Sequence, residues 1–395
     1  MSRIVSVGLY QPVWEERGQR VTGPDEDLIT LAVAAGRSSV TASDEPLERV
    51  ILVCAEPEYL DGVPLPVLLR GLGLAPEVPA ELRVGGAPAV LDAVCSAASG
   101  TLVIGVTTGL GASAGAIRVG DDGPALYDRQ SVANSLPMRV RNISHPRTQV
   151  YADGRVEREL GWKPTIDALA VGHDKPIVVG IDAKDARRLG GRIVDGIPAG
   201  AAGPVFALGL MIEQLDGGRI VALDSAVGSA ATLSTVGEAT ITRDIRPPVP
   251  AEARPRILGA ELTIPFSMPS YERAVVEKVT LTAMRCPQCG TEAYPRRERC
   301  ITCGRMGDGE PFALPRSGEI YSTVTVFAPV PGVPTPRALA IVSLPPTTVR
   351  VLAVVTDAKP SVARIGGRGE LVLRLVAVRE GVPDYGYAFR PEVST

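Results

Sequence analysis

Residues 285–304 read RCPQCGTEAYPRRERCITCG and contain two pairs of cysteines, each with two residues between its members. Ten residues separate the second cysteine of the first pair from the first cysteine of the second. Two such turns can point four thiolates at one ion, and a tetrahedral set of four sulfurs suits Zn²⁺. Gly290 and Gly304 directly follow the pairs, as tight knuckle turns prefer. The spacing therefore predicts one zinc ion bound by Cys286, Cys289, Cys300 and Cys303.

A redox-active dithiol is the other chemistry that a CxxC pair supports. Two paired knuckles favour a metal site over a dithiol, and four of the six cysteines fall within this stretch. Because the protein would fill all four coordination positions, we expect the zinc to be structural rather than catalytic.

A predicted helix precedes the cysteines, and short apolar runs follow them. Residues 270–284 (SYERAVVEKVTLTAM) are interpreted as the helix. Beyond the cysteines, proline and glycine separate β-like runs at residues 319–327, 338–344, 350–356 and 371–378. This spacing predicts a small antiparallel barrel.

The composition changes upstream of that helix. Pro247, Pro248, Pro250 and Pro255 argue against a helix or a central strand there. We therefore expect a linker, and the predicted organisation is a domain at residues 1–240, a linker at 241–270, the helix and zinc ribbon at 271–310 and the barrel at 311–395.

The first 235 or so residues alternate strand and helix signals. Strands are predicted at residues 3–10, 49–55, 102–106, 116–119, 177–181 and 219–224, and helices at 28–40, 86–98, 182–189 and 201–215. Strands that are apolar on both faces are typical of a sheet covered by helices on both sides. Because the two halves repeat a similar order, we predict an α/β fold with a duplicated layered αβαβα domain. The polar stretch 127–163 between the halves is interpreted as a long loop or an insertion.

The composition excludes several classes of function. Lys plus Arg is 41 and Asp plus Glu is 44, so the net charge is −3, and aromatic residues are 4%. A chain with no basic excess and few stacking residues is not expected to bind nucleic acid. The sequence has neither an apolar run long enough to span a membrane nor a secretory signal at residues 1–5. Together with the cysteine pattern, these features predict a cytoplasmic protein.

Few side chains suggest catalysis. Cys95 falls late in the predicted helix 86–98, where a cysteine is usually a small packing residue. His145 and His173 stand beside loop-forming residues, and either could act as an acid or a base. With no partner visible in the sequence, surface or loop roles are favoured for both histidines.

Residues 271–392 resemble the zinc-ribbon and OB-fold proteins that accompany thiolases. The resemblance is carried by RCPQCGTEAYPRRERCITCG, by LPRSGEIYSTVTV (314–326) and by the closing YAFRPE (387–392). It implies that the predicted barrel is an OB-fold. It also implies that this part binds the acyl-CoA arm or docks beside a thiolase-like partner.

Residues 1–235 resemble the thiolase superfamily, within it the branch of hydroxymethylglutaryl-CoA synthase. The resemblance is carried by the order and spacing of these segments: GPDEDLITLAVAAGRSSV (23–40), RVILVCAEPEYLDG (49–62), GGAPAVLDAV (85–94), TLVIGV (101–106) and AGAAGPVFALGLMIEQLDGGRIVALDSAVGSA (199–230). It implies the duplicated thiolase fold, a CoA thioester as ligand and a tendency to dimerise.

The resemblance also shows which catalytic groups are missing. The family's nucleophilic cysteine stands near the start of the helix that GGAPAVLDAV resembles, where this sequence has residues 83–86 (RVGG), and Cys95 lies about three turns too late. Where the family has its histidine, this sequence has residues 180–182 (GID). Where the family has its asparagine, this sequence has residues 197–199 (IPA). Condensation by the usual route needs a thiolate and groups that stabilise an enolate and an oxyanion. That route is therefore expected to fail.

Three hypotheses remain. The first is a thiolase-like protein that binds acyl-CoA or acyl-carrier thioesters and supports acyl transfer or C–C bond chemistry, as a homo-oligomer or with a catalytic thiolase-like subunit. The second is an active acyltransferase or retro-aldol lyase with non-standard residues; its candidate groups are Tyr10, Tyr59, Tyr127, His145 and Asp182. The third is an assembly scaffold that binds no acyl ligand and is held together by zinc.

Overall fold

The computed structural model describes residues 1–42, 45–59, 64–133, 139–142, 145–150, 154–170, 175–192, 194–214, 216–225, 227–257, 265–328 and 333–392. The chain divides into two compact units. The first, called here the α/β unit, comprises residues 1–11, 31–65 and 76–246. The second, the barrel unit, comprises residues 12–30, 66–75 and 247–395.

A mixed ten-stranded sheet forms the frame of the α/β unit. Its strands run in the order β11-β12-β13-β8-β1-β7-β6-β4-β5, and β14 pairs in addition with β1. Their bounds are β1 Ser2–Gln11, β4 Arg49–Cys54, β5 Ala80–Val84, β6 Thr101–Thr107, β7 Ser113–Gly120, β8 Ala125–Ala133, β11 Ile177–Val179, β12 Gly218–Leu223, β13 Val227–Leu233 and β14 Thr240–Ile245.

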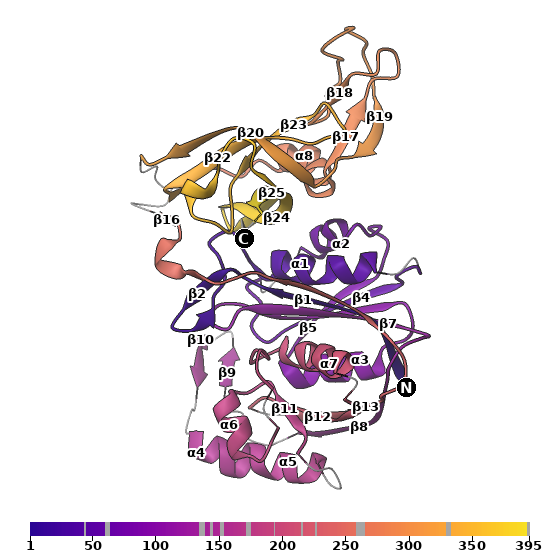
Figure 1. The fold of residues 1–395 in the computed structure, drawn as a ribbon, viewed down its shortest axis with the longest axis vertical. Helices are drawn as coiled ribbons and strands as arrows, with labels where there is room; N and C mark the ends of the chain where they lie inside the picture. Colours follow the sequence, from indigo (N-terminus) through magenta and orange to yellow (C-terminus); the bar gives the residue numbers. More distant parts are fainter. Residues whose placement is uncertain are drawn as a thin grey trace. The chain divides into compact units, whose positions relative to one another are not determined.

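Two buried helices, α3 (Ala87–Ser96) and α7 (Gly203–Glu213), lie side by side between the two limbs of this sheet (Figure 1). The segment GPVFALGLMI of α7 is apolar almost all round, as a helix enclosed by protein must be. Residues of both helices share one core with β1, β4, β7, β11 and β12. These central helices explain why the strands are apolar on both faces.

The outer helices complete the layers. Ser39 of α1 (Leu28–Thr41) donates a hydrogen bond to the carbonyl of Ala116 on β7 and accepts one, at its own carbonyl, from Ser6 on β1. On the other limb, Ile166 and Ala186 belong to a second core with β11–β13. The remaining elements are α2 Leu65–Leu72, β9 Arg139–Asn142, β10 His145–Val150, α4 Gly154–Val156, the π-helix η1 Glu157–Trp162, α5 Lys163–Leu169 and α6 Ala183–Arg188. The predicted layered α/β architecture is confirmed.

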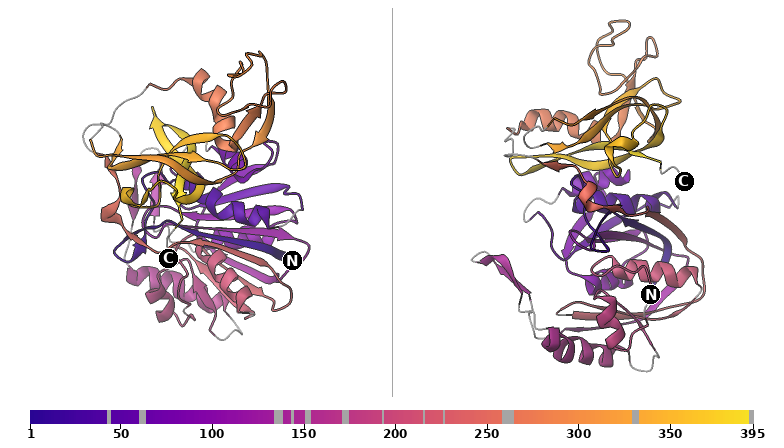
Figure 2. Two further views of the ribbon diagram at one scale, coloured as in Figure 1. Left: turned by 45° about the horizontal axis from the view of Figure 1, so that its top comes forward. Right: turned by 60° about the vertical axis from the view of Figure 1, so that its left-hand side comes forward.

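Five antiparallel strands form the barrel in the order β23-β22-β20-β24-β25 (Figure 2, orange to yellow). A bridge between Val355 and Phe389 brings the two ends of this order together. Their bounds are β20 Ser317–Val326, β22 Arg337–Ser343, β23 Arg350–Val354, β24 Arg368–Arg379 and β25 Val382–Pro391. The expected antiparallel barrel is confirmed, with β25 as a strand that the apolar runs did not predict.

Shorter elements surround the barrel. They are β2 Trp14–Glu16, β3 Gln19–Arg20, β15 Val249–Pro250, the 3₁₀ turn η2 Ala251–Ala253, β16 Arg256–Ile257, α8 Met268–Thr280, β17 Thr282–Arg285, β18 Glu292–Ala293, β19 Glu310–Ala313, β21 Pro334–Thr335 and the 3₁₀ turn η3 Pro360–Val362. Strands β18, β17 and β19 make the sheet of the zinc ribbon.

Two expectations about individual elements need correction. The helix predicted to run to Met284 ends at Thr280, and Leu281 has a φ of +53°. Residues 282–285 form β17 instead, because pairing with β18 and β19 outweighs their local helical pattern. Within the stretch 127–163, residues up to Ala133 continue β8 in the main sheet, so this part is neither a loop nor an insertion. Among the residues described, no helix has the length and apolar character needed to cross a membrane.

Candidate functional sites

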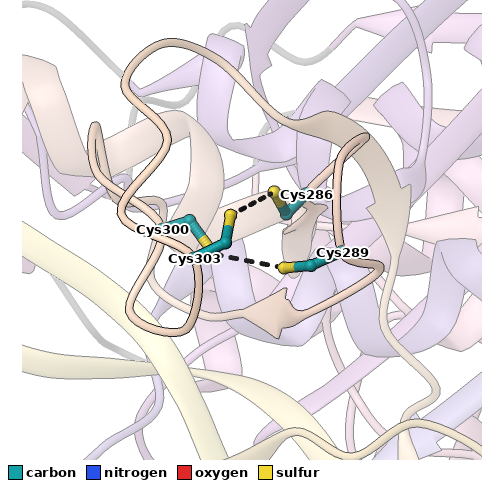
Figure 3. Close-up of side chains that lie close together, drawn as sticks. All are labelled: Cys286, Cys289, Cys300 and Cys303. Atoms are coloured by element: carbon teal, nitrogen blue, oxygen red, sulfur yellow. Dashed lines mark hydrogen bonds between the residues drawn. The ribbon is translucent and has the colours of Figure 1, made fainter.

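The four predicted zinc ligands come together in the ribbon. Figure 3 shows their side chains turned toward one another, and their sulfur atoms all lie within 4.8 Å. The Sγ atoms of Cys286 and Cys303 are 3.7 Å apart, and those of Cys289 and Cys300 are 3.6 Å apart. Four sulfurs at about 2.3 Å from one zinc ion would lie about 3.8 Å apart. The spacing therefore fits a zinc tetrahedron and is far too long for a disulfide bond.

The two knuckles have the same local geometry. Gly290 and Gly304 have φ values of +74° and +73°. The backbone N–H of each donates a hydrogen bond to the backbone carbonyl of the first cysteine in its own pair. A side chain is strained at such φ values, which explains the glycine after each CxxC. Backbone N–H groups of Cys303 and Thr302 lower the pKa of the Cys300 thiol to about 6, which favours the thiolate that a metal binds.

Cys95 lies near the end of α3, half-buried against the central core. Burial, reinforced by the negative charge of Asp92, raises the pKa of its thiol to about 12. The thiol is therefore protonated at neutral pH and is a poor nucleophile.

The variant Cys95→Ala is expected to retain any acyl-thioester binding or turnover. Removing the sulfur costs packing only, at most about 2 kcal/mol in the free energy of unfolding. Chemical denaturation together with an acyl-CoA assay checks both expectations. An acyl group trapped on Cys95 and detected by mass spectrometry would contradict them and restore the conventional covalent route.

Three segments meet at the start of α3. A Cβ atom on Gly180, after β11, would lie 2.6 Å from the Cβ of Ala87. A Cβ atom on Gly203, at the start of α7, would lie 2.8 Å from the carbonyl oxygen of Pro198 and 3.3 Å from the backbone nitrogen of Gly180. By resemblance, the nucleophile, the histidine and the asparagine belong at these segments. The residues that these three segments bring into contact are glycine, alanine and proline, whose side chains supply no base or hydrogen-bond donor.

Asp224, directly after β12, is an ionisable residue at this meeting point. A Cβ atom on Gly86, which precedes α3, would lie 3.2 Å from its Oδ2. The backbone N–H of Val227 donates to its Oδ1 at 2.8 Å, and Trp162 donates to its carbonyl oxygen at 3.0 Å. A carboxylate beside a helix N-terminus is also a common stabilising arrangement. The only feature of the sequence that could have predicted a role for Asp224 is its place at the carboxyl end of a buried strand, and it was not among the candidate residues.

The other candidate residues lie elsewhere in the α/β unit. Asp182 is exposed and directly precedes α6, without a side-chain capping bond. His145 begins β10, paired in register with Asn142. Tyr10 is buried in β1, and Tyr127 is exposed in β8. His173 lies outside the described residues.

A network of buried charges lies in the barrel unit. Arg374 on β24 contacts Asp357 at 2.6 Å and Glu26 at 3.5 Å, and the side chains of both acids are fully buried. Tyr385 on β25 donates to Asp27 at 2.6 Å. Burial raises the pKa of the neighbouring Asp25 carboxyl. The acidic residues before α1 are thus bound to the barrel, and Asp27 in addition accepts the N–H of Thr30 as a helix cap.

Comparison with known proteins gives two kinds of similarity. No family model matches the chain. The chain is 33% identical over 123 residues to a DUF35 domain-containing scaffold protein of Methanocaldococcus jannaschii, covering 30% of this chain and 86% of that protein. A protein of the same description from Methanothermobacter thermautotrophicus is 32% identical over 124 residues, covering 30% and 92% respectively.

Solved structures are also similar. An HMG-CoA synthase complexed with CoA shares 15% identity over 59% of this chain and 82% of its own, with a TM-score of 0.46. A β-ketoacyl-(acyl carrier protein) synthase III from Thermus thermophilus shares 16% identity over 60% and 100%, with a TM-score of 0.48. The Ltp2-ChsH2(DUF35) aldolase shares 25% identity over 31% and 91%, with a TM-score of 0.26. These are proteins of the kinds that the sequence resemblance named.

Proposed function

Over 123 residues the chain belongs to the family of DUF35 domain-containing scaffold proteins, and we propose for it a supporting role in acyl-thioester chemistry. In this proposal the chain binds an acyl-CoA or acyl-carrier thioester and assists a catalytic thiolase-like subunit, or a second copy of itself, in acyl transfer or C–C bond chemistry. A zinc ion held by four thiolates suits a reducing, cytoplasmic setting.

The observation that carries the proposal is the set of residues at the start of α3. Glycine, alanine and proline occupy the place where three segments meet, while the surrounding core is closely packed. A closely packed core is what we expect of a chain that still folds and can still bind a thioester. Carbon–carbon bond formation on a thioester needs a nucleophile to carry the acyl group and donors for the developing oxyanion, which these three residue types cannot supply.

The zinc ribbon and the barrel support the scaffold part of the proposal. A closed four-cysteine site has no open coordination position, so its zinc would hold the ribbon in shape rather than activate a substrate. The two archaeal relatives are scaffold proteins by name, which agrees with that role.

The purified chain alone is expected to show no thiolase-type turnover of short or medium acyl-CoA thioesters. Without the nucleophile and its partners, any residual rate should stay within about 10³–10⁴-fold of the uncatalysed reaction. The assay measures release of free CoA, with and without a catalytic thiolase-like subunit. Calorimetric titration with CoA then separates a binding scaffold from one that takes no acyl ligand.

An active acyltransferase or lyase is the alternative, and the position of Asp224 against the start of α3 favours it. Robust turnover by the lone chain that is lost in Asp224→Asn would establish this alternative and overturn the scaffold proposal. The exposed Asp182, changed to Asn, is the matched control.

A further inference from the structure

The barrel unit contains a cavity of about 370 Å³ that the proposed function does not use. Its wall is apolar for the most part and includes core residues of the barrel: Leu281, Val351, Ala353, Val355, Leu371 and Ala388. Leu352 and Val376 also line it, and they are 72% and 54% exposed. The cavity therefore joins an apolar interior to an open apolar mouth.

Trp14 lies on β2, the central strand of the small sheet β15-β2-β3, and forms part of the cavity wall. Only 2% of this residue is exposed, yet its indole N–H has no hydrogen-bond partner among the described residues. The indole ring forms part of the wall, so its fluorescence should respond to a ligand in the cavity.

Arg337, at the start of β22, supplies positive charge to the same wall. Its Nε is buried, and within the described ranges its guanidinium makes no hydrogen bond or ion pair. The other two cations of the wall are paired, Lys278 with Asp384 at 2.5 Å and Arg374 with Asp357 at 2.6 Å. The charge of Arg337 is therefore available to an anion.

We propose that this cavity is a binding site for a small carboxylic acid with an apolar chain. The carboxylate pairs with the guanidinium of Arg337, and the chain lies against the apolar wall. The volume equals that of about a dozen water molecules, at about 30 Å³ each, which suits an acid of about ten heavy atoms. A whole CoA thioester is too large to be enclosed in it, so a free acid is the ligand proposed for this cavity.

Octanoate is the probe, and the full chain is the protein. The chain has two tryptophans, so Trp162→Phe leaves Trp14 as the sole reporter of tryptophan fluorescence. In this variant, octanoate is expected to change the fluorescence with saturation, and to bind about tenfold more tightly than 1-octanol, which has no charge for Arg337. Calorimetry on the unaltered chain provides a measurement that does not depend on the substitution.

Two further variants test the named contacts. Arg337→Gln, added to Trp162→Phe, is expected to weaken octanoate about tenfold and leave 1-octanol unchanged. Arg364→Gln, at an exposed arginine outside the cavity wall, is the matched control and is expected to change neither affinity. Thermal unfolding of each variant shows whether the fold is kept. No saturable octanoate binding to the unaltered chain, or binding that Arg337→Gln leaves unchanged, would overturn the proposal.

Discussion

Replacing Cys300 by serine is expected to abolish zinc binding and to unfold the ribbon around residues 285–310. The ribbon has only short strands, β17, β18 and β19, of two to four residues each. Such a small module obtains its stability from the metal, whose binding free energy is about 10–16 kcal/mol in isolated zinc-finger peptides. Losing one of four thiolates removes most of that free energy.

The measurement is zinc per chain by atomic emission, with limited proteolysis of the ribbon. The unaltered chain should hold about one zinc ion and resist cleavage there, and the Cys300→Ser chain should hold none and be cut. Cys95→Ala, a cysteine outside the ribbon, is the matched control and should keep its zinc. Metal-free protein with two intact disulfides would contradict the prediction.

Replacing Arg374 by methionine is expected to lower the free energy of unfolding by about 3–5 kcal/mol at neutral pH. Only 2% of the Arg374 side chain is exposed, and the side chains of Asp357 and Glu26 beside it are fully buried. The substitution keeps most of the volume but removes the cation that both carboxylates contact, while Arg390 stays 3.8 Å from Asp357. The loss should be smaller in Asp357→Leu/Arg374→Met, where one stranded charge is removed as well.

The pH dependence of that loss follows from Asp25, which lies 3.9 Å from Arg374. Burial raises the pKa of its carboxyl, and the charge of Arg374 opposes that rise. Without Arg374 the pKa in the folded state rises further above the unfolded value, so the folded protein binds more protons. The stability of the Arg374→Met variant then increases as the pH falls. The difference in the free energy of unfolding between the variant and the unaltered chain should therefore shrink from pH 7 to pH 4. Urea unfolding at both pH values measures it. Arg364→Met, at an exposed arginine of the same unit, is the control; equal losses in both variants would show that the buried ion pairs do not matter.

Patterns local in sequence predicted much of this structure. The CxxC spacing identified all four sulfurs of the ribbon, because a knuckle is built from neighbouring residues. The apolar runs predicted the buried strands and the central helices, because burial on all sides leaves few polar residues. The fifth barrel strand, β25, was missed since its burial alternates irregularly along Val382–Pro391.

Features that depend on distant residues could not be predicted in this way. The acidic residues 25–27 stand directly before the predicted helix 28–40, a position typical of helix N-termini, and Asp27 does cap that helix. Asp25 and Glu26 instead lie beside Arg374, and no local pattern marks an ion pair between residues so far apart. Asp224 meets the start of α3 for the same reason: the contact arises from packing of the sheet around the helix.

The hydrogen bond between Tyr385 and Asp27 joins residues 358 positions apart, and that between Thr356 and Asp25 joins residues 331 apart. Residues 12–30 are therefore translated more than 300 positions before the strands that receive them. The barrel unit thus cannot close until those strands have been made. Closing so long a loop is a slow step, during which apolar and charged groups stay open to chaperones and to aggregation.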